Sequence, residues 1–269
     1  MISIVILTKN EEKDLPMALS SVTWSNDIHI LDSGSTDKTL EIAKKFNAKV
    51  SHNPFKSFGQ QRNHALDKLN IINDWILFLD ADEVVTEKFK KAMFDAIEDA
   101  DKEVAGFYCC WKMMLEDIWL KHCDNFPKWQ FRLMRKGMAR FTDFGHGQKE
   151  SDVKGNIKYL KEPYLHYGFS KGWSQWINRH NRYSNEEAID RVKNKPPFKN
   201  IFSKNSSTRN PALKSWLCRL PGWPFLRFFQ AYILSLGFLE GIPGFIYCIN
   251  MAYYEFLIQI KIREQRKII

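Results

Sequence analysis

The first hundred residues alternate short apolar runs with segments of helical character, and this alternation limits the possible folds most. Ile2–Leu7 is a β-branched run that suits a buried parallel strand, and Trp75–Leu79 is a second continuous apolar run. Asp27–Asp32 and Ala48–Ser51 predict two further strands. Repeated strand–helix units of this length predict an α/β fold with a mostly parallel sheet and helices on both faces. The helices are expected from about Asp14, from Asp37 to Phe46, over Phe58–Leu69 and from Thr86 to Asp99.

The pattern changes after residue 103. Trp173–Lys193 predicts a polar helix, and residues 194–224 are basic and resemble a loop, with Pro196-Pro197 and Pro221. Pro224–Ile260 is strongly apolar and is interrupted at three glycine-containing points. The strands expected in this second half are Val104–Lys112, Gln130–Arg135 and Met138–Phe141.

Positive charge is concentrated at the end of the chain. Residues 191–269 hold 13 Lys and Arg against three acidic residues, whereas residues 1–190 hold 27 against 28. Neither half of the apolar stretch clearly reaches the ~20 residues of a spanning helix, and Glu240 lies inside it. We therefore expect helices that lie in one leaflet beside anionic head groups. Two core helices packed on the catalytic domain, or a transmembrane hairpin, are the alternatives.

The cysteines and the start of the chain bear on the compartment. Five cysteines without metal-ligand spacing indicate reduced thiols. The apolar run after Met1 is too short for a signal peptide and lacks a cleavage signature. The expected location is therefore the cytoplasm, with peripheral or monotopic attachment to the inner face of the plasma membrane.

Three predicted strands end in polar clusters, which should meet at one edge of the sheet because ligands of open α/β sheets bind at the carboxyl ends of strands. The clusters are Thr8–Glu12, Asp32–Asp37 and Asp80-Ala-Asp82. Two carboxylates at positions i and i+2 can share Mg²⁺ or Mn²⁺ and neutralise a diphosphate leaving group. Solvated or capping carboxylates are the alternative for an isolated Asp-x-Asp, but the other two clusters favour the metal site. The chain contains neither a dinucleotide-binding glycine fingerprint nor a P-loop.

These segments resemble family 2 glycosyltransferases of the GT-A fold. The resemblance rests on residues 4–11 (Ile-Val-Ile-Leu-Thr-Lys-Asn-Glu), 31–37 (Leu-Asp-Ser-Gly-Ser-Thr-Asp), 61–63 (Gln-Arg-Asn) and 75–83 (Trp-Ile-Leu-Phe-Leu-Asp-Ala-Asp-Glu). More loosely, residues 145–150, 166–171, 179–184 and 237–245 resemble a membrane-associated bacterial group that builds lipopolysaccharide core or exopolysaccharide. The implied fold is a Rossmann-like GT-A domain with a C-terminal apolar helical appendage.

The resemblance implies a nucleotide pocket and a metal site. Asp82 would be the principal metal ligand, with Asp80 near the ribose and the metal. His166 is a candidate third ligand, or equally a structural histidine beside Tyr167. The remaining nucleotide-binding positions are Thr8, Asn10, Glu11, Asp32, which would face the base, and Arg62, which would approach the diphosphate.

An inverting enzyme of this kind needs a carboxylate to take the acceptor's proton. We expect Glu150, with Asp143 in reserve, although related sequences often carry a His-Glu pair and His146 here lies four residues earlier. A solvated loop carboxylate is the alternative for Glu150. Residues that could line the acceptor side are Trp111, Trp129, Arg132, Arg179 and Arg182, although core packing explains tryptophans equally well.

The sequence thus predicts an inverting, metal-dependent glycosyltransferase that moves a sugar from a nucleotide-sugar, expected to be UDP-linked, to a lipid-linked or polysaccharide acceptor. A sugar nucleotidyltransferase and a non-enzymatic basic binder are the alternatives, and no nucleic-acid partner is expected. The predicted domains are a GT-A catalytic domain over 1–193, with a nucleotide-binding half (1–100) and an acceptor half (101–193), a basic linker over 194–223, and membrane-associating helices over 224–269.

Overall fold

The computed structural model describes residues 1–144 and 147–268, with side chains up to residue 265. The chain forms two compact units. The sheet unit comprises Met1–Met114 and Phe126–Lys171, and the helical unit comprises Leu115–Asn125 together with the chain from Gly172 onward. Gly145 and His146, which belong to one of the resembling segments, lie outside the described residues.

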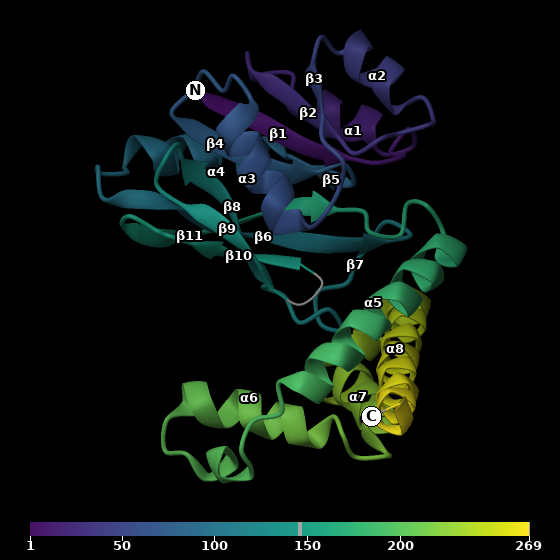
Figure 1. Ribbon diagram of the computed structural model, residues 1–269. Coiled ribbons are helices and arrows are strands. Elements are labelled where there is room, and N and C mark those ends of the chain that lie inside the picture. Colours follow the sequence, from purple (N-terminus) through teal and green to yellow (C-terminus); the bar gives the residue numbers. More distant parts are fainter. Residues whose placement is uncertain (145–146, 269) are drawn as a thin grey trace. The chain divides into compact units, whose positions relative to one another are not determined.

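The sheet unit is built on one large mixed sheet (Figure 1). The strands follow the order β3-β2-β1-β4-β8-β6-β11-β5, in which β3, β2, β1 and β4 run parallel, as do β6 and β11. Strand β8 is antiparallel to both β4 and β6, and β5 is antiparallel to β11. The strands are β1 (Ile2–Thr8), β2 (Ile28–Asp32), β3 (Lys49–His52), β4 (Trp75–Asp80), β5 (Glu83–Val84), β6 (Val104–Leu115), β8 (Trp129–Arg135) and β11 (Asn156–His166).

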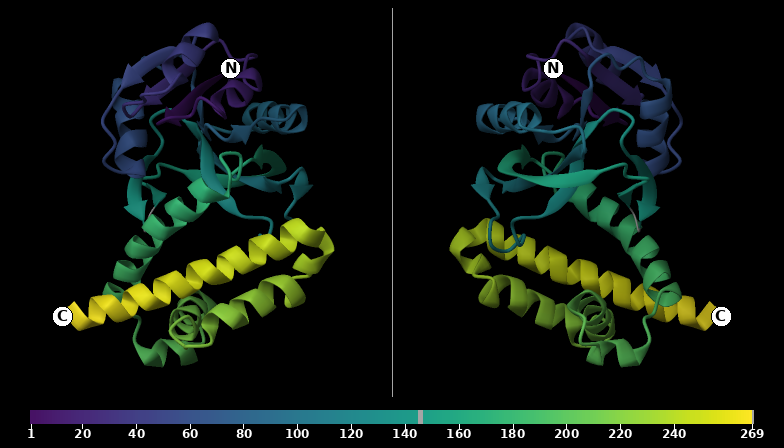
Figure 2. Two further views of the ribbon diagram at one scale, coloured as in Figure 1. Left: turned by 90° about the vertical axis from the view of Figure 1, so that its right-hand side faces the viewer. Right: turned by 90° about the vertical axis from the view of Figure 1, so that its left-hand side faces the viewer.

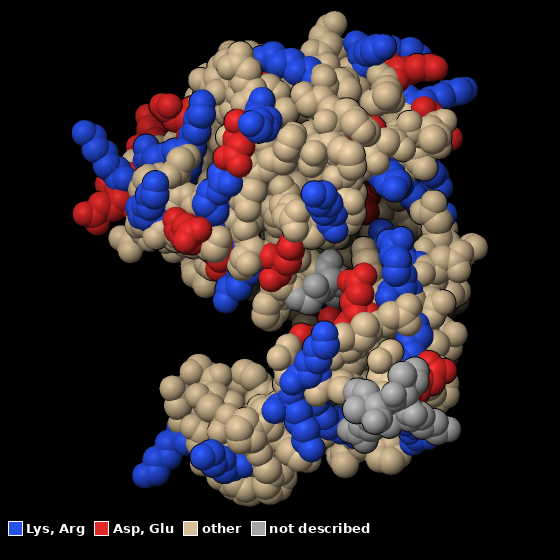
Figure 3. Space-filling view, in the orientation of Figure 1, with Lys and Arg blue, Asp and Glu red and all other residues tan. Residues whose placement is uncertain are grey.

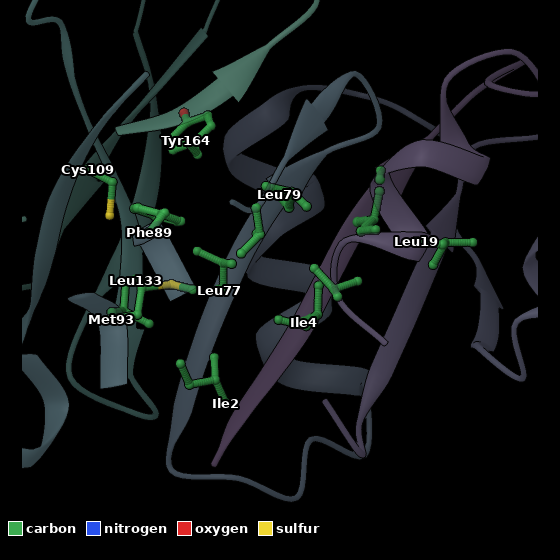
Figure 4. Close-up of a cluster of buried hydrophobic side chains, with 14 of the residues drawn as sticks. Ile2, Ile4, Leu19, Leu77, Leu79, Phe89, Met93, Cys109, Leu133 and Tyr164 are labelled. Atoms are coloured by element: carbon green, nitrogen blue, oxygen red, sulfur yellow. The ribbon is translucent and has the colours of Figure 1, made fainter. Parts of the chain in front are cut away.

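A hydrophobic core lies on each face of this sheet. On one face, α1 and α4 pack on β1 and β4 through side chains such as Leu19, Leu77, Phe89 and Met93 (Figure 4). On the other face, α3 packs with the separate two-stranded sheet β9–β10, where Phe78 and Phe141 meet edge to face at 5.4 Å. Burial of each such side chain contributes ~1.5–3 kcal/mol. The elements are α1 (Leu15–Ser20), α2 (Thr39–Lys45), α3 (Phe58–Lys68), α4 (Glu87–Glu98), β9 (Arg140–Phe144) and β10 (Gly147–Ser151).

The helical unit contains a long helix with shorter helices beside it (Figure 2). Helix α5 packs along α8 through Ala188, Ile258 and Ile262, and Arg191 makes two hydrogen bonds of 2.8 and 3.1 Å to the Glu255 carboxylate. The elements are β7 (Ile118–Trp119), α5 (Trp173–Lys193), a 3-10 helix (Phe198–Phe202), α6 (Ser206–Leu217), α7 (Trp223–Phe229), a π-helical turn (Gln230–Leu234), a 3-10 turn (Gly237–Glu240) and α8 (Gly241–Ile268).

The two units do not follow the predicted boundary after residue 193. Helix α5 was expected in the catalytic domain, but its contacts with α8 place it in the helical unit. The expected loop over 194–224 is also wrong in part, because it holds α6 and a 3-10 helix. Glu240 is buried within this unit, where its carboxylate accepts hydrogen bonds from the backbone N–H groups of His122 and Cys123.

In the described part of the chain, no individual helix has the length and apolar character needed to cross a membrane. Two consecutive segments, Trp223–Leu234 and Gly237–Gln265, meet that requirement only when taken together, and they are bent by 73° relative to each other.

Candidate active site

The side chains of two arginines and two carboxylates form a network where β4 ends, in which Arg62, Arg132 and Glu83 are buried and Asp80 is 37% exposed. Arg132 donates to both oxygens of Asp80, at 3.0 and 2.6 Å, and to Glu83 at 2.7 Å. Arg62 from α3 adds a contact of 3.3 Å to Asp80, and the Tyr164 hydroxyl donates to Glu83 at 3.1 Å. The exposed fraction is only 1% for the Arg62 side chain and 2% for that of Arg132.

A β-bulge places Arg132 in this network. Phe107 pairs with Leu133 and Tyr108 pairs with Phe131, so that Arg132 is the extra residue of β8. Such a bulge re-aims a side chain, which here directs the guanidinium to the end of β4. Arg132 is buried against Asp80 and Glu83 and acts as their counter-ion, and its predicted place on the acceptor side stays a prediction.

The network also sets the charges of its carboxyl groups. Burial would raise the pKa of Asp80, but Arg132 and Arg62 outweigh it and hold the pKa well below its usual range. Burial raises the pKa of Glu83 to about 7, although Arg132 opposes that change. Asp80 is therefore an anion whose two oxygens are already hydrogen-bonded to guanidinium groups.

Asp82 and His166 form a second pair two residues further on. The Asp82 Oδ2 atom lies 3.4 Å from His166 Nε2, and the Tyr167 N–H donates to the Asp82 carbonyl at 2.8 Å. Burial would lower the pKa of His166, but the Asp82 carboxylate raises it to about 9. Trp111 packs edge-on against the His166 ring at 6.1 Å, so this predicted acceptor residue lies next to the pair.

The pair fits a divalent ion. Two neighbouring ligands of an octahedral ion, each at ~2.1 Å from it, are ~3 Å apart, which is close to the observed 3.4 Å. Mg²⁺ and Mn²⁺ sites commonly take one or two protein ligands and complete their shell with substrate phosphates and water. The described residues hold no group of three His, Cys, Asp or Glu side chains arranged for a metal, and both oxygens of Asp80 accept hydrogen bonds from Arg132.

The predicted nucleotide-binding residues after β1 and β2 lie together. Asp32 is buried, and its carboxylate accepts from the Thr8 and Ser35 hydroxyls and from the N–H groups of Gly34 and Ser35. Asn10 has a left-handed backbone (φ 57°), and its side chain accepts from the Thr36 N–H at 2.8 Å. Asp32 thus shapes the turn after β2, and a contact from it to a nucleotide base stays a prediction.

Arg62 is held between two aromatic rings. Its guanidinium carbon lies 5.4 Å from the centre of the Phe78 ring and 5.6 Å from that of Phe141. Burial lowers its pKa to about 10. The structure therefore brings Arg62 to Asp80 from inside the protein, and its approach to a diphosphate stays a prediction.

The predicted base Glu150 lies in a different part of the sheet unit. It accepts a hydrogen bond from the Tyr108 hydroxyl and lines a pocket of about 290 Å³. The pocket belongs to the face that carries the second core, and its described lining is Tyr108, Trp129, Gln130, Phe131, Phe141, Phe144, Gln148, Lys149 and Glu150. Asp143 instead accepts from the Gly59 N–H at 3.0 Å and so fixes the start of α3.

Two further predicted residues, Arg179 and Arg182, lie on α5 in the helical unit, and their acceptor role stays a prediction. Sequence reasoning missed Tyr108, Glu83 and Tyr164 as partners of the predicted residues. Glu83 stands directly beside the acidic pair and was quoted only for its resemblance. Nothing in the local sequence marks the two tyrosines.

The comparisons with known proteins show the family of the chain. The family model "Glycosyl transferase family 2" matches residues 3–148. A glycosyltransferase of Rickettsia conorii is 30% identical over 274 residues, covering 98% of this chain and 90% of the relative. The chain belongs to glycosyltransferase family 2. It is therefore an enzyme, and the two alternative classes are set aside.

Two other similarities are more distant. The lipopolysaccharide core biosynthesis glycosyltransferase LpsC of Rhizobium meliloti is 23% identical, covering 98% of this chain and 92% of the relative. A crystal structure of Staphylococcus aureus TarS (residues 1–349) with UDP-GlcNAc has 16% identity and a TM-score of 0.49, covering 99% of this chain and 91% of that one. A structural likeness of that degree supports no conclusion about the ligand of this chain.

Proposed function

We propose that this family 2 glycosyltransferase is a metal-dependent, inverting enzyme that uses a UDP-linked sugar and extends a lipid-linked or lipopolysaccharide-type acceptor. The observation that carries the proposal is the Asp82–His166 pair beside the end of β4, whose 3.4 Å separation suits two ligands of one divalent ion. The name of the Rhizobium relative, which spans nearly all of this chain, supports the acceptor class.

In the proposed reaction, the acceptor hydroxyl oxygen forms a bond to the anomeric carbon while the bond from that carbon to the diphosphate oxygen breaks. The electron pair leaves with UDP. A divalent ion held by Asp82 and His166 would act as a Lewis acid for the departing diphosphate. A carboxylate must take the hydroxyl proton, and Glu150 stays the candidate for this role. Tyr108 donates to Glu150 and would orient it, and the role requires the acceptor to extend from the metal site to the pocket that Glu150 lines.

Metal dependence is tested with the purified full chain, Mn²⁺ and a panel of nucleotide-sugars, with nucleotide release as the readout. We expect Asp82→Asn to remove Mn²⁺-dependent release and to leave the circular dichroism spectrum unchanged. Asp74→Asn is the matched control, because Asp74 is an exposed carboxylate at the opposite end of β4. Undiminished release by Asp82→Asn, or full release by the wild type in EDTA, would refute the proposed metal site.

We also propose that the helical unit binds the cytoplasmic face of the membrane. Many of its large apolar side chains are exposed, with exposed fractions of 81% for Phe225 and 73% for Ile242. Figure 3 shows lysine and arginine side chains beside uncharged surface on this unit. An apolar surface flanked by positive charge suits an anionic lipid bilayer. Further exposed members are Phe198, Phe202, Leu226, Phe229, Leu234 and Leu239.

Membrane binding is tested by co-sedimentation with vesicles of phosphatidylcholine alone or with added phosphatidylglycerol. We expect binding that increases with anionic lipid and weakens in the double variant Phe225→Ser, Ile242→Ser. Ile72→Ser, at an exposed apolar residue of the sheet unit, is the control. Salt-sensitive retention of DNA without vesicle binding would contradict this location.

A further inference from the structure

A short segment joins Asp82 to the loop after β1. Residues 167–171 directly follow His166, and we call them the strap. The strap begins at the 2.8 Å hydrogen bond from the Tyr167 N–H to the Asp82 carbonyl. It turns through the hydrogen bond from the Ser170 N–H to the Tyr167 carbonyl, at 2.9 Å. The strap therefore connects His166, which directly precedes it, to Lys171 at its far end.

Lys171 holds the far end of the strap against the loop after β1. Its Nζ atom lies 2.7 Å from Glu11 Oε2 and donates to the Asn10 carbonyl at 2.9 Å. The exposed fraction is 22% for the Lys171 side chain and 20% for that of Glu11. Lys13 makes a second connection by donating to the Ser170 carbonyl.

The surroundings of Lys171 are rich in negative charge. Burial, together with the carboxylates of Asp82 and Asp14, raises the pKa of Glu11 to about 7, although Lys171 opposes that change. The arginines at the end of β4 are almost fully buried against Asp80 and Glu83. Lys171 differs from them because part of its side chain is open to solvent.

We propose that Lys171 binds the diphosphate of the nucleotide-sugar donor, and that Glu11 holds its ammonium in position until the donor arrives. This inference rests on the proposed function. A lysine is a compact charge on a flexible stem, so exchanging a carboxylate for a phosphate oxygen needs only rotations of its side chain. As the anomeric carbon–oxygen bond breaks, charge develops on the leaving diphosphate, and Lys171 stabilises that charge while it keeps all its protons.

The test measures equilibrium binding of UDP and of uridine to the full chain in Mn²⁺. We expect Lys171→Ala to weaken UDP binding roughly 10- to 100-fold, the loss of a charge-assisted hydrogen bond, and to leave uridine binding unchanged. Lys171→Gln, which can still donate to Glu11 and Asn10, removes the charge with less disturbance of the strap. It should show a similar loss. The control Lys45→Ala, at an exposed lysine in the last turn of α2, should leave both affinities within about twofold of wild type.

The outcomes separate this inference from the proposed function. If the wild type binds UDP tightly and Lys171→Gln binds it equally well, the role of Lys171 is overturned and the proposed function is not. A wild type that binds no UDP would overturn the UDP donor and this inference together. For Glu11→Gln we expect UDP binding at least as tight as in the wild type, because the competing carboxylate charge is gone. A loss equal to that of Lys171→Ala would refute the holding role of Glu11.

Discussion

The replacement of Arg132 by methionine tests the reasoning about the buried charge network most directly. Arg132 is the main cation for Glu83 and donates to both oxygens of Asp80. Removing one partner of a buried ion pair destabilises a protein by ~3–5 kcal/mol. In Arg132→Met, Arg62 still faces Asp80 and Glu83 can take up a proton. We therefore expect a loss of stability at the low end of that range, about 3 kcal/mol. This equals a fall in Tm of roughly 6–12 °C at this chain length.

The loss should depend on pH in a defined direction. The pKa of Glu83 is raised to about 7 even with Arg132 present, and it rises further when that cation is gone. A carboxyl whose pKa is higher in the folded than in the unfolded state lowers stability as pH increases through that range. Arg132→Met should therefore lose more stability relative to wild type at pH 8 than at pH 6.

The assay is urea unfolding followed by tryptophan fluorescence at both pH values. Arg135→Met is the control, because Arg135 lies on the same strand but contacts backbone carbonyls and the Trp75 ring. The double variant Arg132→Met, Glu83→Gln should recover at least about 1 kcal/mol, since the unpaired carboxylate is gone. If the free energy of unfolding of Arg132→Met lies within about 1 kcal/mol of the wild-type value at pH 8, Arg132 is not the cation that stabilises Asp80 and Glu83.

Three further predictions follow from other parts of the chain. Asp27→Asn should cost about 2 kcal/mol at pH 7, because hydrogen bonds that outweigh burial lower the Asp27 pKa to about 2. The difference in free energy of unfolding between wild type and Asp27→Asn, measured with urea, should shrink as the pH falls from about 4 towards 2. Over that range Asp27 takes up a proton in the wild type, which then loses the stabilisation by the ionised carboxylate. Gly59→Ala should cost ~1–3 kcal/mol, because a Cβ atom there would meet Asp143 Oδ1 at 2.8 Å, whereas Gly222→Ala, with nothing within 4 Å, should change stability little. Glu240→Ala should speed hydrogen exchange at His122 and Cys123, whose N–H groups it binds, and unchanged protection would contradict that contact.

The first half of the fold could be predicted because its signals are local. Strands β1, β2 and β4 are short runs rich in apolar and β-branched residues, whereas β3 is a short, mostly exposed edge strand. All four observed strands match the expected ones to within one or two residues. The polar helix over Trp173–Lys193 begins and ends where it was predicted. Burial on both faces of a parallel strand leaves a continuous apolar run, which can be recognised without knowledge of the partners.

The missed elements depend on distant partners. β11 contains several charged residues and Pro163, which argue against a strand. The register shift between Leu160 and Tyr164 accommodates the proline beside β6. Helix α6 was read as a loop because the basic segment around it contains Pro196-Pro197 and Pro221, and Pro211 also lies inside the helix. No local pattern distinguishes these segments from loops.

The candidate site shows the same division. The position of Asp80 and Asp82 at the end of a buried strand follows from the sequence, but the different surroundings of the two carboxylates do not. Arg132 reaches Asp80 only because β8 carries one extra residue between its pairs with β6, and a bulge is a property of two strands together. His166 reaches Asp82 only because β11 pairs with β5, with His166 opposite Glu83. Two carboxylates that look equivalent in the sequence thus separate into one held by arginines at the strand end and one facing a histidine, which is the pair on which the proposed metal site rests.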